Sequence, residues 1–231
     1  CSSLFNVQLK DQYDNLVTVA SNTNFTMASS DSAGTTFYSD ACTTSIGTTA
    51  TIASGQNSVN LYFKDTVTGT ATLTASGFTT DGTQNYTITA DSEADVGFSS
   101  AAQSSVVAGT CSAALTVQRQ DQFGNAVAPA STTDITVTSN SGNTLIYNNS
   151  DCSDAGGASG VVTISSAAST ANIYFSQEEA ESFTLTATSS ISGSGTQAAI
   201  VIAATPNTLQ ITSTAQSVVA GSCSGATVVT A

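Results

Sequence analysis

The stretch that decides the fold occurs twice in the chain. Residues 111–125 read CSAALTVQRQDQFGN, and residues 1–15 read CSSLFNVQLKDQYDN. The two stretches align without a gap at an offset of 110 residues. Self-similarity at a long fixed period indicates tandem copies of one folding unit.

The repeat continues along the chain, now at an offset of 112 residues. LYF at 61–63 matches IYF at 173–175, and VVAGTCS at 106–112 recurs as VVAGSCS at 218–224. A further pair, ATLTA and FTLTA, begins at residues 71 and 183. The sequence therefore predicts two periods and the opening of a third.

Within each period, short runs of alternating apolar and polar residues are separated by clusters of Gly, Asn, Asp and Ser. This pattern is typical of half-buried antiparallel strands, and no run shows the 3.6-residue period of an amphipathic helix. The expected strands are 4–10, 23–28, 35–41, 48–53, 59–64, 70–76 and 86–90 in the first copy, and 113–119, 134–139, 144–150, 161–166, 171–176, 182–189 and 197–203 in the second. Seven strands in about 100 residues fit an immunoglobulin-like sandwich. We predict an all-β fold of tandem immunoglobulin-like β-sandwich repeats of about 110 residues each.

The segments before two of the cysteines, 96–107 and 209–219, are each predicted to be the first strand of the following sandwich. The expected domains are repeat 1 at 1–92, without its first strand, repeat 2 at 93–205, and the start of a third repeat at 206–231. A sandwich without an edge strand exposes unpaired backbone groups that can template strand addition. Two explanations stay open: the sequence is a window cut from a longer chain, or the tail of one subunit completes the head of the next.

The five cysteines follow the repeat. Cys1 and Cys42 are 41 positions apart, as are Cys111 and Cys152, and Cys223 opens the third copy. Equal spacing predicts one intradomain disulfide per repeat, with Cys223 paired outside this sequence. A loop of this size stabilises a domain by roughly 4 kcal/mol in the chain-entropy model, and disulfides persist only in oxidising compartments, so we expect export. A structural zinc site is not expected, because two thiols per repeat and no His cannot supply four ligands.

The charge is strongly acidic, with Lys10, Lys64 and Arg119 against 16 carboxylates and a formal net charge of −13. Phosphate backbones and anionic lipids repel such a surface, so we expect no nucleic-acid partner. No apolar run reaches the roughly 18 residues of a membrane helix, so direct membrane insertion is not expected. The chain has no His, which removes the usual general base near neutral pH, and we predict a protein without enzymatic activity.

Residues 115–127, LTVQRQDQFGNAV, followed by TDITVTS at 133–139, resemble the group-1 bacterial immunoglobulin-like repeats of invasin- and intimin-type adhesins. Residues 11–15 are a weaker copy, with Asp14 where that family usually has Gly. The paired cysteines depart from the general pattern of the family and indicate a disulfide-containing variant. The resemblance implies a stiff extracellular spacer on a bacterial cell surface that holds an adhesive or anchoring end away from the cell.

We therefore expect a non-catalytic structural or adhesive repeat region of a bacterial surface protein, forming an extended stalk or filament. Its partners would be neighbouring repeats or subunits of the same protein. Two alternatives stay open. One is a self-assembling filament or surface-layer subunit joined head-to-tail by strand complementation, and the other is a module that binds a cell-surface receptor or glycan. The lack of Trp speaks against the second.

Calcium is the one metal that the sequence favours, because hard oxygen ligands are plentiful. Asp91, Glu93 and Asp95 fall at the junction of the first two repeats, where a bound ion could fix the angle between them. Solvated linker charge is the alternative, and the next junction, 203–206, has no carboxylate. No other cofactor is expected.

Two further motifs have structural explanations. Asp121, Gly124 and Asn125 suit a strand-connecting turn, since Asp and Asn can bond their own backbone and Gly takes a positive φ cheaply; a cation site is the alternative. Asn24, Asn85 and Asn148 stand in N-glycosylation sequons, which arise often by chance in a chain so rich in Asn, Ser and Thr.

Overall fold

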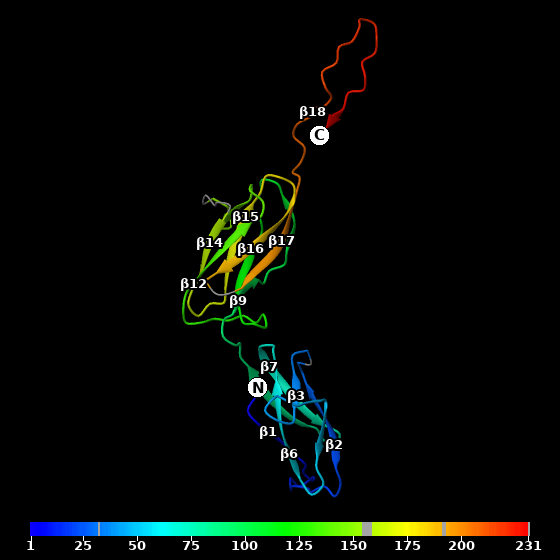
Figure 1. The fold of residues 1–231 in the computed structure, drawn as a ribbon, viewed down its shortest axis with the longest axis vertical. Helices are drawn as coiled ribbons and strands as arrows, with labels where there is room; N and C mark the ends of the chain where they lie inside the picture. The colour runs from blue at the N-terminus through cyan, green and yellow to red at the C-terminus, as the bar shows by residue number, and fades with distance from the viewer. Residues whose placement is uncertain (32, 154–158, 191–192, 231) are drawn as a thin grey trace. The chain divides into compact units, whose positions relative to one another are not determined.

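The computed structural model describes residues 1–31, 33–153, 159–190 and 193–230 (Figure 1). All the regular elements in these residues are strands, which confirms the predicted all-β fold. The described residues contain no helix long and apolar enough to cross a lipid bilayer. Contacts divide the chain into two compact units: Cys1–Asp95 with Arg119–Pro129 and Ala167–Ser169, and Val96–Gln118 with Ala130–Ser166 and Thr170–Ala231. The expected domain boundaries after residues 92 and 205 stay predictions.

The first sandwich contains the blue to blue-green strands of Figure 1. They are β1 (Phe5–Gln8), β2 (Thr23–Ser29), β3 (Thr36–Tyr38), β4 (Ser45–Gly47), β5 (Thr49–Ile52), β6 (Ser58–Lys64), β7 (Gly69–Ser76) and β8 (Gly82–Ile88). One sheet has the order β1-β6-β3-β4 and the other β5-β2-β7-β8. Alternate side chains of both sheets turn inward, and Phe25, Met27, Leu61, Phe63 and Leu73 are buried in one core. The strands are therefore half-buried, as the alternating pattern predicts.

The second sandwich contains the green to orange strands β9–β17. They are β9 (Asp95–Phe98), β10 (Gln103–Val107), β11 (Leu115–Gln120), β12 (Thr133–Ser139), β13 (Leu145–Tyr147), β14 (Ser159–Ile164), β15 (Thr170–Ser176), β16 (Ser182–Ser189) and β17 (Ser194–Ile202). The sheet orders are β10-β17-β16-β12-β14 and β13-β15-β11-β9. Leu115, Val117, Ile135, Ile173 and Leu185 are completely buried in its core.

The predicted single strand 96–107 is wrong in one respect, because it forms two strands in different sheets. β9 lies beside β11 in one sheet, whereas β10 runs parallel to β17 in the other and pairs Val106 with Val201. One straight strand cannot border two facing sheets, so the chain crosses between them at residues 99–102. Val96 and Val106 are both buried, so each half of this crossing segment closes one side of the core.

The first sandwich lacks this cover within the described residues. β1 occupies the place of β11, and β8 occupies the place of β17, but each is the last strand of its sheet. Phe5 and Val7 are consequently only half-buried.

Two other strand predictions differ from the structure. The last strand of the first sandwich is β8 (Gly82–Ile88) rather than 86–90, because its pairing with β7 begins at Gly82, opposite Ala75. The tail does not form the predicted strand 209–219. Only β18 (Gln210–Ile211) is extended there, and it pairs with β19 (Val229–Thr230). With no sheet beside them, Leu209 and Ile211 stay exposed.

One disulfide joins two loops of each sandwich. Cys1 is bonded to Cys42, and Cys111 to Cys152, with Cα–Cα distances of 5.9 and 5.8 Å. Cys223 is an exposed free thiol. Each sandwich therefore has its own cross-link as well as its own core.

The second disulfide is expected to stabilise its sandwich strongly. Replacing Cys111 and Cys152 by Ser should lower the free energy of unfolding by about 2–4 kcal/mol, because the unfolded chain regains the freedom of the opened loop. Urea unfolding followed by circular dichroism measures the loss. Cys223→Ser is the matched control and should leave the free energy of unfolding unchanged. An equal loss in both variants would show that the disulfide does not stabilise the sandwich.

Candidate functional site

The repeated Asp turn has the same geometry in both sandwiches. Asp121 Oδ1 accepts hydrogen bonds of 2.9 Å from the backbone N–H groups of Phe123 and Asn125, and Asn125 Nδ2 donates to Asp121 Oδ2 at 2.9 Å. Gly124 has a φ of 86°. The carboxylate thus ties down the peptide groups of its own turn, as the strand-connecting interpretation predicts.

The first copy of the turn repeats these bonds with one strained residue. Asp11 Oδ1 accepts from the N–H groups of Tyr13 and Asn15, both at 2.9 Å. Asp14 stands at the Gly124 position and takes a φ of 71°, which a non-glycine residue adopts at a cost. The side-chain amide of Asn15, followed by the two backbone donors, holds the pKa of Asp11 below its ordinary value.

Burial alone would raise the pKa of Asp121. The hydrogen bonds from Asn125, Asp91 and Phe123 outweigh that effect, so the pKa is lowered and the carboxylate stays ionised. Both copies of the Asp turn therefore use a charged acceptor to hold a loop.

A second kind of carboxylate cap lies beside the distal cysteine of each disulfide. Asp40 accepts from the N–H groups of Thr43 and Thr44 at 2.9 and 2.8 Å, and from their hydroxyls at 2.6 and 2.7 Å. The hydroxyl of Thr43, followed by the Thr44 donors, holds the pKa of Asp40 well below its ordinary value. In the second sandwich, Asp151 accepts from the hydroxyl of Ser153 at 2.8 Å. These caps fix loops whose cysteines have positive φ, 61° at Cys42 and 52° at Cys152.

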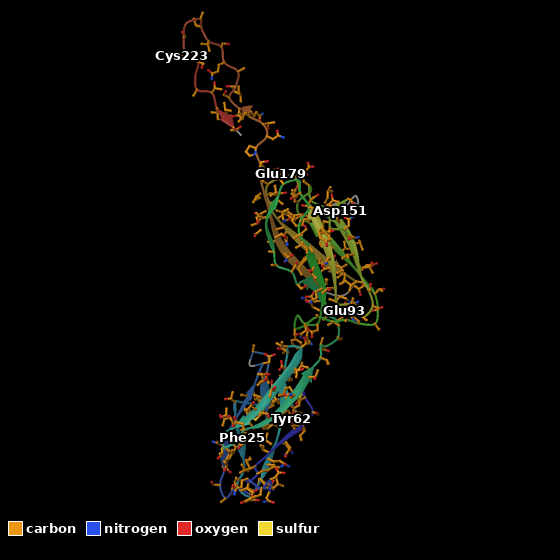
Figure 2. The ribbon with its side chains drawn as sticks, turned by 180° about the vertical axis from the view of Figure 1, so that it is seen from behind. Phe25, Tyr62, Glu93, Asp151, Glu179 and Cys223 are labelled. Atoms are coloured by element: carbon orange, nitrogen blue, oxygen red, sulfur yellow. A yellow bond between two sulfur atoms is a disulfide. The ribbon has the colours of Figure 1, made fainter. Side chains whose placement is uncertain are left out.

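The junction residue Glu93 forms an ion pair that the sequence analysis missed. Arg119 Nε donates to Glu93 Oε1 at 2.5 Å and Arg119 Nη2 to Oε2 at 2.6 Å, with the arginine side chain 1% exposed (Glu93 is labelled in Figure 2). Arg119 continues the inward alternation of Leu115 and Val117, and a charged residue on a buried face requires a partner of opposite charge. The inward position of Arg119 in this alternation is the sequence signal from which a buried ion pair could have been predicted.

The three candidate calcium ligands are not brought together as a metal site. Among the described residues, no three His, Cys, Asp or Glu side chains form a group that could hold a metal ion. Glu93 is bound to Arg119, and Asp91 Oδ2 accepts from Gln122 Nε2 at 2.9 Å. Calcium binding by Asp91, Glu93 and Asp95 stays a prediction, and a shift of the melting temperature with calcium would be its test.

A polar network fills the inner side of the acidic loop between β15 and β16. Gln177, 1% exposed, donates from Nε2 to Ser141 Oγ at 2.9 Å and to Glu181 Oε1 at 2.7 Å. Ser141 Oγ also donates to Glu181. Glu178 and Glu179 are exposed, as expected for a loop, whereas Glu181 is half-buried and serves as an acceptor inside this network.

The three sequon residues are all exposed. Asn24 lies on β2, Asn85 on β8 and Asn148 directly after β13. Their side chains take part in surface hydrogen bonds: Asn24 and Asn85 accept from Thr51 and Thr72, each at 2.7 Å, and Asn148 donates to the Val161 carbonyl at 2.9 Å. Glycosylation at these sites stays a prediction.

No family model matches the chain, and no curated protein sequence matches it. Solved structures that resemble it include domains 1–6 of the surface layer protein SbsC, at 21% identity and a TM-score of 0.34, covering 87% of this chain and 23% of that one. Domains 4 and 5 of the S-layer protein SbsC match at 21% identity and a TM-score of 0.33, covering 84% and 79%. A beta-glycosidase from Bacteroides vulgatus matches at 12% identity and a TM-score of 0.38, covering 86% and 24%. Similarity at this level establishes neither a shared arrangement nor a function, and the invasin/intimin-type family assignment stays a prediction.

The cap at Asp40 should make the first sandwich sensitive to acid. Because its folded pKa is lowered, the cap stabilises the fold above the unfolded pKa of about 3.9, and this contribution is lost as pH falls through the folded pKa. Asp40→Asn, which cannot accept the hydroxyl bonds at Oδ2, should lower the melting temperature by a few degrees, on the order of 5 °C, at neutral pH and progressively less below about pH 4.

Thermal melts across that pH range measure the effect of Asp40→Asn. Asp81→Asn removes the same charge from an exposed carboxylate outside both kinds of turn and serves as the control. A shift of equal size at every pH, or an equal shift in the control, would show that the cap does not act through its ionised form.

The ion pair of Glu93 and Arg119 should behave as one unit. Glu93→Gln removes the carboxylate charge that this pair places against the buried guanidinium and should cost about 3–5 kcal/mol. Adding Arg119→Leu should recover most of this loss, because Leu9 occupies the same place in the first sandwich. Urea unfolding of the two single variants and the double variant gives the coupling energy. A double variant no more stable than Glu93→Gln would contradict the account.

Proposed function

We propose that this chain is a non-catalytic structural module of an exported cell-surface protein, and that its sandwich repeats assemble into a surface layer or filament. The observation that carries the proposal is the duplication of one design. The strand orders β1-β6-β3 and β5-β2-β7-β8 of the first sandwich recur as β11-β15-β13 and β14-β12-β16-β17 in the second. Each sandwich also has an aromatic and aliphatic core, an Asp turn and a disulfide between corresponding cysteines. Units that are stabilised separately and repeated along a chain suit an extended mechanical role.

The use of the carboxylates supports a structural role over a chemical one. Asp11, Asp40, Asp121 and Asp151 each accept hydrogen bonds from their own loop, and Glu93 neutralises a buried arginine. These groups are committed to holding turns and one buried ion pair. The acidic residues of the chain are thus explained by local stability together with solubility.

The cross-links support an extracellular location. Two disulfides close in the described residues, and such bonds persist in oxidising surroundings. The exposed sequons and the high negative charge fit a surface that faces the medium. A single continuous stalk is another form of the same role. A module that binds a host receptor or glycan through loops at one end of a sandwich, as immunoglobulin loops do, stays an alternative.

Immunogold electron microscopy of intact source cells, with antibodies against the folded chain, tests this function. The expected result is label on the outer surface, following a regular array or fibres, with both disulfides intact in material analysed under non-reducing conditions. Label confined to the cell interior, or reduced Cys1, Cys42, Cys111 and Cys152 in native material, would overturn the proposal.

A further inference from the structure

A buried glutamine amide, a serine hydroxyl and a glutamate carboxylate meet at one end of the second sandwich. Gln177 directly follows β15, Ser141 comes shortly after β12, and Glu181 directly precedes β16 (Glu179, labelled in Figure 2, lies in the same loop). Gln177 is 1% exposed, and its Nε2 donates to Ser141 Oγ at 2.9 Å and to Glu181 Oε1 at 2.7 Å. The Ser141 hydroxyl donates to the same Glu181 oxygen at 2.5 Å. Three groups that can react with one another are therefore in mutual contact.

These contacts give each group a role in acyl transfer. A hydroxyl becomes a nucleophile when an adjacent base accepts its proton, and Glu181 is hydrogen-bonded to the hydroxyl of Ser141. The same carboxylate contacts Gln177 Nε2, the atom that must receive a proton to leave as ammonia. The backbone N–H of Glu179 donates to Gln177 Oε1 at 3.2 Å, the oxygen on which negative charge develops during attack. Nucleophile, proton carrier, leaving group and oxyanion donor thus lie within one network.

Neighbouring groups hold the serine and the glutamine in place. Ser141 N donates to Ser139 Oγ at 3.0 Å, and Ser139 Oγ donates to Thr144 Oγ1 at 2.9 Å. Thr144 is completely buried, and its hydroxyl oxygen lies 3.4 Å from Gln177 Nε2. Two reacting groups held in contact behave as if each were present at a very high local concentration. The burial of Gln177 also keeps water from its carboxamide carbon, which protects an ester at that carbon from hydrolysis.

We propose that Ser141 and Gln177 join through an intramolecular ester bond formed by the folded chain itself. Glu181 takes the hydroxyl proton while Ser141 Oγ attacks the side-chain carboxamide carbon of Gln177. A rotation about the Cγ–Cδ bond of Gln177, a torsion with a broad range of allowed angles, turns the face of this carbon toward Oγ. The proton then passes from Glu181 to Nε2, the C–N bond breaks, and one molecule of ammonia leaves. The reaction consumes no cofactor and no outside reactant.

The ester links the two sheets of the second sandwich. Ser141 follows β12 of one sheet and Gln177 follows β15 of the other. The bond closes a loop whose ends are 36 positions apart, similar to the 41 positions of the disulfide in the same sandwich. It therefore restricts the unfolded chain in the same way as the disulfide does. The reaction modifies the chain once and acts on no outside substrate, so it goes beyond the proposed structural function without making the protein an enzyme.

The first sandwich lacks all three reacting groups at the equivalent positions. The residues that stand there are Asp31 in place of the serine, Asp65 in place of the glutamine and Gly69 in place of the glutamate. Asp65 accepts a hydrogen bond of 2.6 Å from Thr35 Oγ1, but a carboxylate has no leaving group comparable to ammonia. The chain should therefore lose one ammonia, from the second sandwich.

Intact mass spectrometry of the full, folded chain tests the bond. With both disulfides closed, the mass should be lower than that of the unlinked chain by one ammonia. Tandem mass spectrometry of a protease digest should then find Ser141 and Gln177 in one cross-linked peptide. Hydroxylamine, which cleaves esters but leaves ordinary amides intact, should separate that peptide into its two parts.

Two variants and one control assign the roles. Ser141→Ala lacks the nucleophile and Glu181→Gln lacks the base, so both should keep the full mass, with circular dichroism and closed disulfides showing that they are folded. Glu178→Gln changes an exposed carboxylate of the same loop and should lose ammonia like the parent chain. A folded parent chain of full mass, an ammonia loss that persists in Ser141→Ala or Glu181→Gln, or a loss located at another residue would overturn the proposal.

Discussion

The structure depends on backbone pairing at the sheet edges. The N–H and C=O groups of the edge strands need partners, and the core between the two sheets needs cover at its sides. In the second sandwich a single segment meets this requirement by bordering β11 and then crossing to β17. Val96 and Val106 close two sides of the core, and Leu115 and Val117 behind them are completely buried. The first sandwich has counterparts of β11 to β17, with β4 as an additional strand, but no crossing segment in its described residues. Its equivalent side chains, Phe5 and Val7, are half-buried. Cover for the core and pairing for the edge strands are therefore supplied by the same piece of chain.

The fold class, the repeat and the two disulfide pairs could be predicted from the sequence, because each leaves a periodic signal. Alternation locates the strands whose two faces differ, such as β12 and β16, to within a few residues. It could not show that 96–107 divides between two sheets, since both halves read as one extended run. Nor could it show that 209–219 remains unpaired, because alternation describes the faces of a strand and says nothing of its edges. Arg119 was readable as an inward position, but its partner Glu93 lies 26 residues away and becomes visible only when β9 and β11 are adjacent.

Each sandwich is stabilised locally, and this bears on its proposed role. The disulfides join loops within one sandwich, and the carboxylates of Asp11 and Asp40 accept hydrogen bonds from residues only a few positions away. Such interactions do not depend on what lies beyond the sandwich, so repeats can be added to an array without altering those already folded.

Hydrogen exchange of the backbone amides in the assembled, native protein tests most directly the claim that every sandwich is completed by a crossing segment. The amides of Asn6 and Gln8, which face the open side of β1, should exchange as slowly as those of Thr116 and Gln118, which face the crossing segment. If Asn6 and Gln8 instead exchange at the rate of exposed loop amides in the assembled material, the edges of the first sandwich are not filled, and the account of how these sandwiches are completed is wrong.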